Sequence, residues 1–147
     1  LNGVLNDGGK TVNVLGNMVN SASHTSGGGT GSITLAGAGG QTVSGNGEGV
    51  FGNLNISSTA AVGTVAATIT ANMGVANTLN FATLHILAIG SNRLSLTNVS
   101  PSTAITSDNP FSNQSFVQTA GNQSDLGLQK TYGGAESFIF PVGTGTK

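Results

Sequence analysis

The amino-acid sequence predicts an all-β protein, a right-handed parallel β-helix of about seven coils. Three observations predict this fold. Apolar residues alternate with polar ones, large apolar residues recur every 21 positions, and glycines and small polar residues separate the apolar pairs. Because alternation is also typical of an antiparallel β-sandwich, that architecture is the alternative.

The composition favours a β-rich extracellular protein. Gly, Ser, Thr and Asn fill 74 of the 147 positions, whereas charged residues make up 6% and the net charge is −1. Helices favour Glu and Lys on their surfaces, and both are scarce here. The four Lys and Arg residues are scattered, which excludes a basic patch for nucleic acid or an anionic membrane. The chain has no cysteine for a disulfide framework or a thiolate metal site.

The predicted strands are short, and two apolar residues in each face the core. In chain order these pairs are Val12/Val14, Ile33/Leu35, Leu54/Ile56, Leu79/Phe81, Leu84/Ile86, Leu94/Leu96 and Leu126/Leu128. No segment favours a helix, because the best candidate, residues 60–76, contains β-branched residues and two glycines.

A longer repeat links these pairs. Seven large apolar residues lie 21 positions apart: Val12, Ile33, Leu54, Val75, Leu96, Val117 and Phe138. A unit of about 20 residues that buries its apolar face only against its neighbours is typical of a solenoid. Since each coil adds about 4.8 Å along the axis, seven coils would form a rod about 34 Å long.

Residues 1–147 are expected to form a single solenoid region, with atypical or terminal coils in residues 108–147. Leu1 opens directly into patterned sequence, so we expect an excerpt of a longer chain. Pro141 follows the alternating Phe138 and Phe140 and is expected to end or edge that strand, because proline cannot donate to a β-ladder.

Two glycine-rich motifs are candidate binding loops. Residues 28–35 nearly fit the calcium-binding nonapeptide GGxGxDxUx, but Ile33 stands where an Asp should coordinate the ion. Residues 47–52 match GxGxxG, but the NLNIS that follows predicts a strand rather than the helix a dinucleotide site requires. We interpret both motifs as solenoid corners and expect no metal and no cofactor.

Histidines and acids are the candidates for catalysis. His24 lies in a predicted polar loop, and His85 is expected to point outward because it alternates with apolar neighbours. Neither lies near an acid in sequence, although folding could bring Asp7 or Asp125 close. A paired-carboxylate site would need acids within about 5–9 Å of one another. The five acids are Asp7, Glu48, Asp108, Asp125 and Glu136, and we expect no catalytic site.

Three stretches carry a resemblance to a known group of proteins: GSITLAGAGGQTVSGNG, VFGNLNIS and SFIFPVGTGTK. They resemble the repeats of very large secreted surface proteins of bacteria that export through the type IX system. In those repeats "tiTLnG" leads to "QTiSG", then to "FnNLtI", and a block closes with "FPVG". The matching segments here are residues 33–37, 41–45, 51–56 and 140–143. The resemblance covers most of the chain, is weakest across residues 60–98, and implies a β-helical, adhesin-like stalk with no catalytic residue.

The sequence thus predicts a structural or adhesive module without catalytic activity, secreted to the extracellular face of a Gram-negative cell surface. The alternative is a glycan-binding or carbohydrate-processing β-helix. Against it, Tyr132 is the only tyrosine, tryptophan is missing, and the six phenylalanines mostly look buried. Without capping helices or charged edges, the expected partners are further coils of the same polypeptide or identical subunits stacked end to end. A surface glycan or host ligand is a further expected partner.

Overall fold

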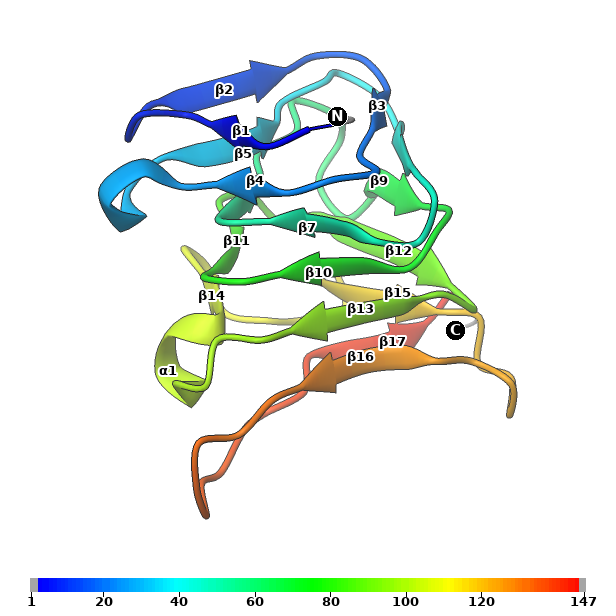
Figure 1. The fold of residues 1–147 in the computed structure, drawn as a ribbon. Helices are drawn as coiled ribbons and strands as arrows, with labels where there is room; N and C mark the ends of the chain where they lie inside the picture. The colour runs from blue at the N-terminus through cyan, green and yellow to red at the C-terminus, as the bar shows by residue number, and fades with distance from the viewer. Residues whose placement is uncertain (1–2, 146–147) are drawn as a thin grey trace.

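The computed structural model describes residues 3–145, in which short parallel strands stack into a β-solenoid of about five turns (Figure 1). Each complete turn contributes one strand to each of three faces. Helix within the described part is limited to α1 (Pro101–Ala104) and one 3-10 turn, η1 (Gly27–Gly29). The all-β solenoid prediction is confirmed. The sandwich alternative is wrong, because every pairing between the described strands is parallel.

The first face contains a four-stranded and a two-stranded sheet. The four strands are β7 (Gly49–Phe51), β10 (Met73–Val75), β13 (Arg93–Leu96) and β16 (Gly127–Lys130). The two strands are β1 (Leu5–Asn6) and β4 (His24–Thr25). A parallel bridge between Ser23 and Val50 connects the two sheets.

The second and third faces are each one continuous sheet. The second consists of β2 (Thr11–Val14), β5 (Ser32–Leu35), β8 (Leu54–Ile56), β11 (Leu79–Phe81) and β14 (Ile105–Ser107). The third consists of β3 (Met18–Val19), β6 (Gln41–Ser44), β9 (Val65–Ile69), β12 (Ile86–Gly90), β15 (Phe116–Thr119) and β17 (Val142–Thr144).

The core is built from alternating inward residues, as most of the apolar pairs predict, but the inward assignment of Leu126 is wrong, because it is 50% exposed. The pairs Ile33/Leu35, Leu54/Ile56, Leu79/Phe81 and Leu94/Leu96 are almost completely buried, and Val12/Val14 pack against the same core. The inward assignment of Leu84 and Ile86 is wrong: Leu87 and Ile89 are buried instead, while Ile86 is partly exposed. In LHILAI, apolar residues occupy both even- and odd-numbered positions. Alternation alone therefore does not determine which of them face the core.

The 21-residue spacing is confirmed at two places, the start of the second face and one pair on the first face. Val12, Ile33 and Leu54 are in register, but Leu54 then pairs with Leu79, not Val75. Val75 and Leu96 pair on the first face, and Val117 lies on the third. The turns therefore number about five, not seven. Corner loops lengthen the later turns, which costs little because loop-closure entropy grows slowly with length.

Two local predictions have opposite outcomes. Residues 60–76 form β9 and β10, so the prediction that this segment is not helical is confirmed. The predicted strand ending at Pro141 is wrong, because Phe138 and Phe140 lie outside the described strands and β17 starts immediately after the proline. The Pro141 carbonyl accepts a hydrogen bond from the N–H of Val117, which ties this segment to β15.

Candidate functional site

Folding brings His24 into contact with Asp7. Nε2 of His24 lies 2.9 Å from Oδ2 of Asp7, and neither side chain has exposed surface. The contact follows from strand pairing, because Asp7 comes directly after β1, which lies beside β4 and its His24. Of the two acids expected to approach a histidine, Asp7 does so, whereas Asp125 accepts a hydrogen bond from the hydroxyl of Ser91.

Backbone N–H groups complete this network. The N–H of Gly52 donates to Nδ1 of His24, which places the ring proton on Nε2, from where it is donated to Asp7. Oδ1 of Asp7 accepts from the N–H groups of Gly9 and Gly27, each at 2.8 Å. Burial by itself would raise the pKa of the Asp7 carboxyl, but these hydrogen bonds outweigh burial and hold that pKa below its usual value.

The Asp7–His24 pair has a structural role. A β-carbon at Gly31 would lie 1.9 Å from Oδ1 of Asp7, so the chain packs closely around the carboxylate. The network joins the first turn through Asp7, the second through His24 and the third through Gly52. With both side chains enclosed, the pair offers a substrate no access.

His85 is also buried, and the prediction that it points outward is wrong. Its exposed fraction is 2%. Nδ1 lies 2.8 Å from Oγ1 of Thr83, and Nε2 lies 3.2 Å from the carbonyl oxygen of Ala60. Since a carbonyl can only accept, Nε2 donates to it. His85 therefore connects the loop between β11 and β12 with the carbonyl of Ala60, and both of its hydrogen-bond partners are uncharged.

The remaining acids contact neutral groups. Hydrogen bonds connect Glu48 with Asn46, Asp108 with Asn80, and Asp125 with Ser91, while Glu136 is exposed. Within residues 3–145, no three His, Asp or Glu side chains come close enough to hold a metal ion together.

Both glycine-rich motifs lie at turns. Gly28 and Gly29, in η1, have φ values of 60° and 80°, and Gly47, before β7, has a φ of 91°. Such angles suit glycine and support the interpretation of these motifs as corners. The GxGxxG segment enters β7 and is followed by β8, so the helix that a dinucleotide site needs is missing there.

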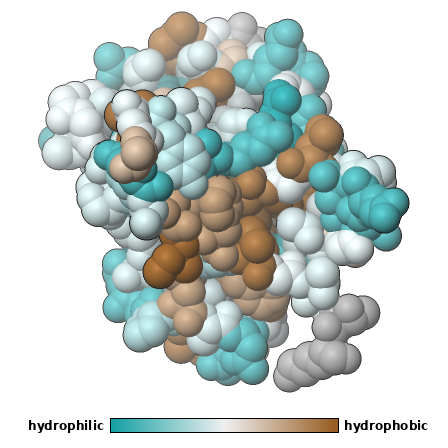
Figure 2. Space-filling view, turned by 90° about the horizontal axis from the view of Figure 1, so that it is seen from below, coloured by the Kyte–Doolittle hydropathy of each residue, from teal (hydrophilic) through white to brown (hydrophobic). Residues whose placement is uncertain are grey.

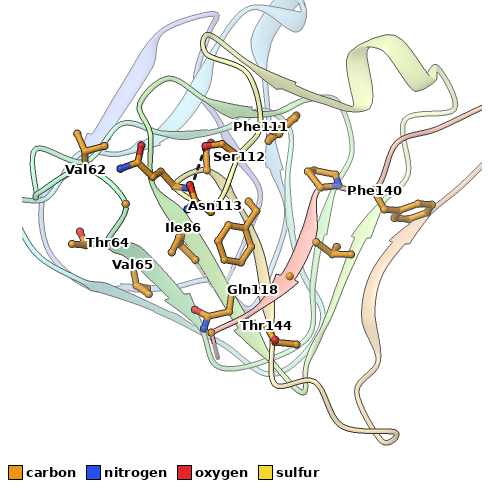
Figure 3. Close-up of a pocket in the computed structure, with 18 residues that line it drawn as sticks. Val62, Thr64, Val65, Ile86, Phe111, Ser112, Asn113, Gln118, Phe140 and Thr144 are labelled. Atoms are coloured by element: carbon orange, nitrogen blue, oxygen red, sulfur yellow. Dashed lines mark hydrogen bonds between the residues drawn. The ribbon is translucent and has the colours of Figure 1, made fainter. Parts of the chain in front are cut away.

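A pocket of about 950 Å³ lies on the outer side of the third face (Figure 3). Strands β9, β12, β15 and β17 contribute to its lining, together with two loops at residues 62–64 and 111–115. Figure 3 shows Val62 at one end and Phe140 at the other, with Ile86 between them. We call this site the third-face pocket.

The floor of the third-face pocket is a row of outward side chains. Ile86 pairs with Val65 on one side and with Phe116 on the other, and all three are partly exposed. A β-carbon at Gly143 would lie 3.0 Å from Cε2 of Phe116, so the absence of a side chain lets the ring lie against β17. The floor thus presents one aromatic ring beside two aliphatic side chains.

Two loops form the walls of the third-face pocket. Gln114 packs on Gly63, where a β-carbon would lie 3.3 Å from Cγ of the glutamine. The ring of Phe111 contacts the buried ring of Phe81 edge-on, with centroids 5.7 Å apart. The core thereby anchors the 111–115 loop.

The lining of the third-face pocket is uncharged but polar. None of its 18 residues is Asp, Glu, Lys, Arg or His. The side-chain amides of Asn113, Gln114 and Gln118 make no hydrogen bond within residues 3–145, so their donors and acceptors are available to a ligand.

Three phenylalanines line the third-face pocket, so the prediction that the phenylalanines are mostly buried is wrong. Phe51 and Phe81 are completely buried, whereas Phe111, Phe116, Phe138 and Phe140 keep exposed surface. One sequence signal could have revealed this. Val117 is assigned to the core, and since side chains alternate across a strand, its neighbour Phe116 must face outward.

Comparisons with protein-family models, with curated proteins and with solved structures gave no match. The resemblance to surface proteins exported by the type IX system thus stays a prediction from sequence. In residues 3–145, no helix is long and apolar enough to cross a membrane.

Proposed function

We propose that the chain is a structural, adhesive module without catalytic activity, giving length and rigidity to a stalk or filament at a bacterial cell surface. The observation that carries this proposal is the open end of the stack. Strands β16 and β17 end their sheets, and each has one edge without a partner strand among the described residues. Unpaired edges of this kind accept further strands.

The apolar core is uncovered at this end. Val142 is in register with Val117, yet Val142 is 47% exposed while Val117 is completely buried. Leu128 is likewise only partly buried, although its partner Leu94 is fully buried. Figure 2 looks onto this end and shows apolar residues gathered in the middle of the surface. One further turn would bury them, as each turn buries the one before it.

The opposite end has the same character. Val12 and Val14 are partly exposed, whereas their partners Ile33 and Leu35 are buried. Leu15 is 73% exposed. Two open ends that both present apolar strands favour extension in both directions.

Hydrogen bonds between turns support the proposed rigidity. The amide nitrogen of Asn80 donates to Oδ1 of Asn55 at 3.1 Å, and its Oδ1 accepts from the hydroxyl of Thr106 at 2.8 Å. These residues are in register on the second face, so one uncharged column connects three successive turns.

We propose that further coils of the same polypeptide cover the ends, with stacking of identical subunits as the second candidate. The sequence resemblance supports secretion through the type IX system to the extracellular face of a Gram-negative cell. We further propose that the coil is right-handed, since crossovers between parallel strands have that hand in about 98% of cases.

Measuring the solution mass of the purified chain at rising concentration tests the proposal. We expect the mass to increase and fibres to appear by electron microscopy, because isolated open ends should pair with one another. A strictly monomeric species at high concentration would contradict the proposal. Release of reducing ends from polysaccharides incubated with the protein would contradict its non-catalytic part and favour the carbohydrate-processing alternative.

A further inference from the structure

We propose that the third-face pocket binds a neutral polysaccharide chain. The inference rests on the adhesive part of the proposed function, for which it supplies a ligand class. The pocket opens on an outer face, although its lining includes β17, the strand at one open end of the stack.

The size of the third-face pocket favours an oligomeric ligand. Small-molecule sites occupy about 300–1,000 Å³, and the volume of about 950 Å³ lies at the upper end of that range. The lining residues come from the third turn at Val62, the fourth at Ile86, and the strands β15 and β17 that follow. The pocket therefore extends along the stack and suits several linked sugar rings.

Aromatic surface supplies the first half of the recognition. Phe116 is partly exposed in the floor, and Phe140 is 40% exposed at one end. The C–H face of a pyranose ring is apolar and packs on the face of an aromatic ring. A chain of sugars would place one ring on Phe116 and another near Phe140.

Amide groups supply the second half. Asn113, Gln114 and Gln118 each carry two N–H donors and a carbonyl acceptor without a partner in residues 3–145. Adjacent hydroxyls on a sugar both donate and accept, so an amide satisfies two of them at once. An aliphatic ligand would leave these groups unsatisfied, which costs binding free energy.

The uncharged lining excludes other ligand classes. Nucleic acids and acidic polysaccharides need Lys or Arg, and none lines the pocket. A peptide that binds by strand addition needs a free sheet edge. The floor presents the outward side of strands β9, β12 and β15, which are already paired on both edges, so within the lining only the outer edge of β17 could take such a peptide.

Two glycines of β17 and its C-terminal flank shape the pocket. Gly143 leaves room for the Phe116 ring, and a β-carbon at Gly145 would lie 1.9 Å from Nε2 of Gln118. The ring of Phe116 and the amide of Gln118 therefore occupy space that a side chain at Gly143 or Gly145 would fill. Preorganised groups of this kind lose little conformational freedom on binding.

The test is titration of the folded protein with neutral hexasaccharides (cellohexaose, xylohexaose, mannohexaose and maltohexaose) and with hexagalacturonate as a charged counterpart. Calorimetry gives the affinity, and NMR amide shifts give the location. We expect at least one neutral hexasaccharide to bind, with shifts in residues 62–65, 111–118 and 140–145. The charged hexasaccharide should bind more weakly.

Two variants probe the two halves of the site. Phe116→Ala removes the stacking ring and should weaken binding about tenfold. Gly145→Ala displaces only the flexible end of Gln118, so the fold should persist while binding weakens. The matched control Gln129→Ala removes an exposed amide elsewhere and should leave affinity unchanged.

Four results would overturn the inference. They are binding of none of the neutral hexasaccharides, stronger binding of the charged one, amide shifts confined to other regions, and equal affinity of Gly145→Ala and the unmodified protein. A chain that binds in the pocket but never self-associates would contradict only the stalk proposal. A chain that forms fibres without binding would contradict only the pocket.

Discussion

Asp7 and His24 are 17 residues apart in sequence and are joined by a buried 2.9 Å hydrogen bond between the first two turns of the solenoid. The carboxylate also accepts backbone N–H groups from Gly9 and Gly27. In a chain with 6% charged residues, one buried acid thus organises the entry to the stack. Its protonation should affect stability.

The first prediction is that the stability of the folded state falls in acid because of Asp7. The folded-state pKa of Asp7 is lowered below its unfolded value, so its stabilising contribution is complete well above the unfolded pKa of about 3.9 and is lost as the pH falls through the folded-state pKa. Asp7→Asn should lower the urea midpoint at neutral pH and flatten the decline in acid. Circular dichroism at a series of pH values measures both.

Glu48→Gln is the control, because Glu48 is exposed and contacts only a neighbouring amide. The pKa of Asp125 is also lowered, chiefly by the hydroxyl of Ser91, so some acid dependence should persist in Asp7→Asn. An acid decline of equal steepness in Asp7→Asn and the unmodified protein would show that Asp7 is not responsible.

The second prediction concerns the core at Leu54. Leu54 is 1% exposed and lies in register between Ile33 and Leu79. Leu54→Asp should lower the free energy of unfolding by at least about 4 kcal/mol, because a carboxylate would be buried without a partner. Val99→Asp, at a 50% exposed position, should change it by less than about 0.5 kcal/mol. Chemical denaturation measures both, and a stable, cooperatively folded Leu54→Asp would show that Leu54 does not face the core.

The third prediction separates a structural glycine from a dispensable one. A β-carbon at Gly49 would lie 2.2 Å from the carbonyl oxygen of Asn20, which is backbone and cannot easily move away. Gly49→Ala should therefore cost about 1–3 kcal/mol of stability. Gly39→Ala, where no atom lies within 4 Å, should be neutral or slightly stabilising. Equal melting temperatures for the two variants would show that the close approach of Gly49 to the carbonyl of Asn20 does not constrain the residue at position 49.

Local patterns in the sequence were sufficient to predict the fold class and most core residues. Pairs such as Ile33/Leu35 and Leu54/Ile56 face inward because strand alternation is a property of neighbouring residues. The number of turns could not be predicted in the same way. It depends on corner loops such as the one containing α1, whose lengths the strand pattern does not constrain.

The third-face pocket could not be predicted from the sequence for a related reason. Its walls come from segments as distant as residues 62–65 and 140–145, and only the register between turns brings them together. The prediction for LHILAI was also one residue out of register: it assigned Ile86 to the core, whereas Ile86 is part of the floor of the third-face pocket. The buried positions of His24 and His85 depend on the same packing between turns.

The last prediction concerns how the open ends meet. Val142 and Leu15 are exposed apolar residues at opposite ends of the stack. Head-to-tail stacking joins two different surfaces, so the contact does not close and fibres can grow. A lysine at either end should block its own contact, since charged side chains on an open edge prevent strand addition. Val142→Lys and Leu15→Lys should each remain monomeric in sedimentation experiments. Mixed together, they should form dimers and nothing larger, because each variant keeps one intact end.

Val62→Lys, exposed but away from both ends, should associate as the unmodified protein does. If Val142→Lys and Leu15→Lys still form fibres, or if their mixture stays monomeric, the ends do not stack head to tail.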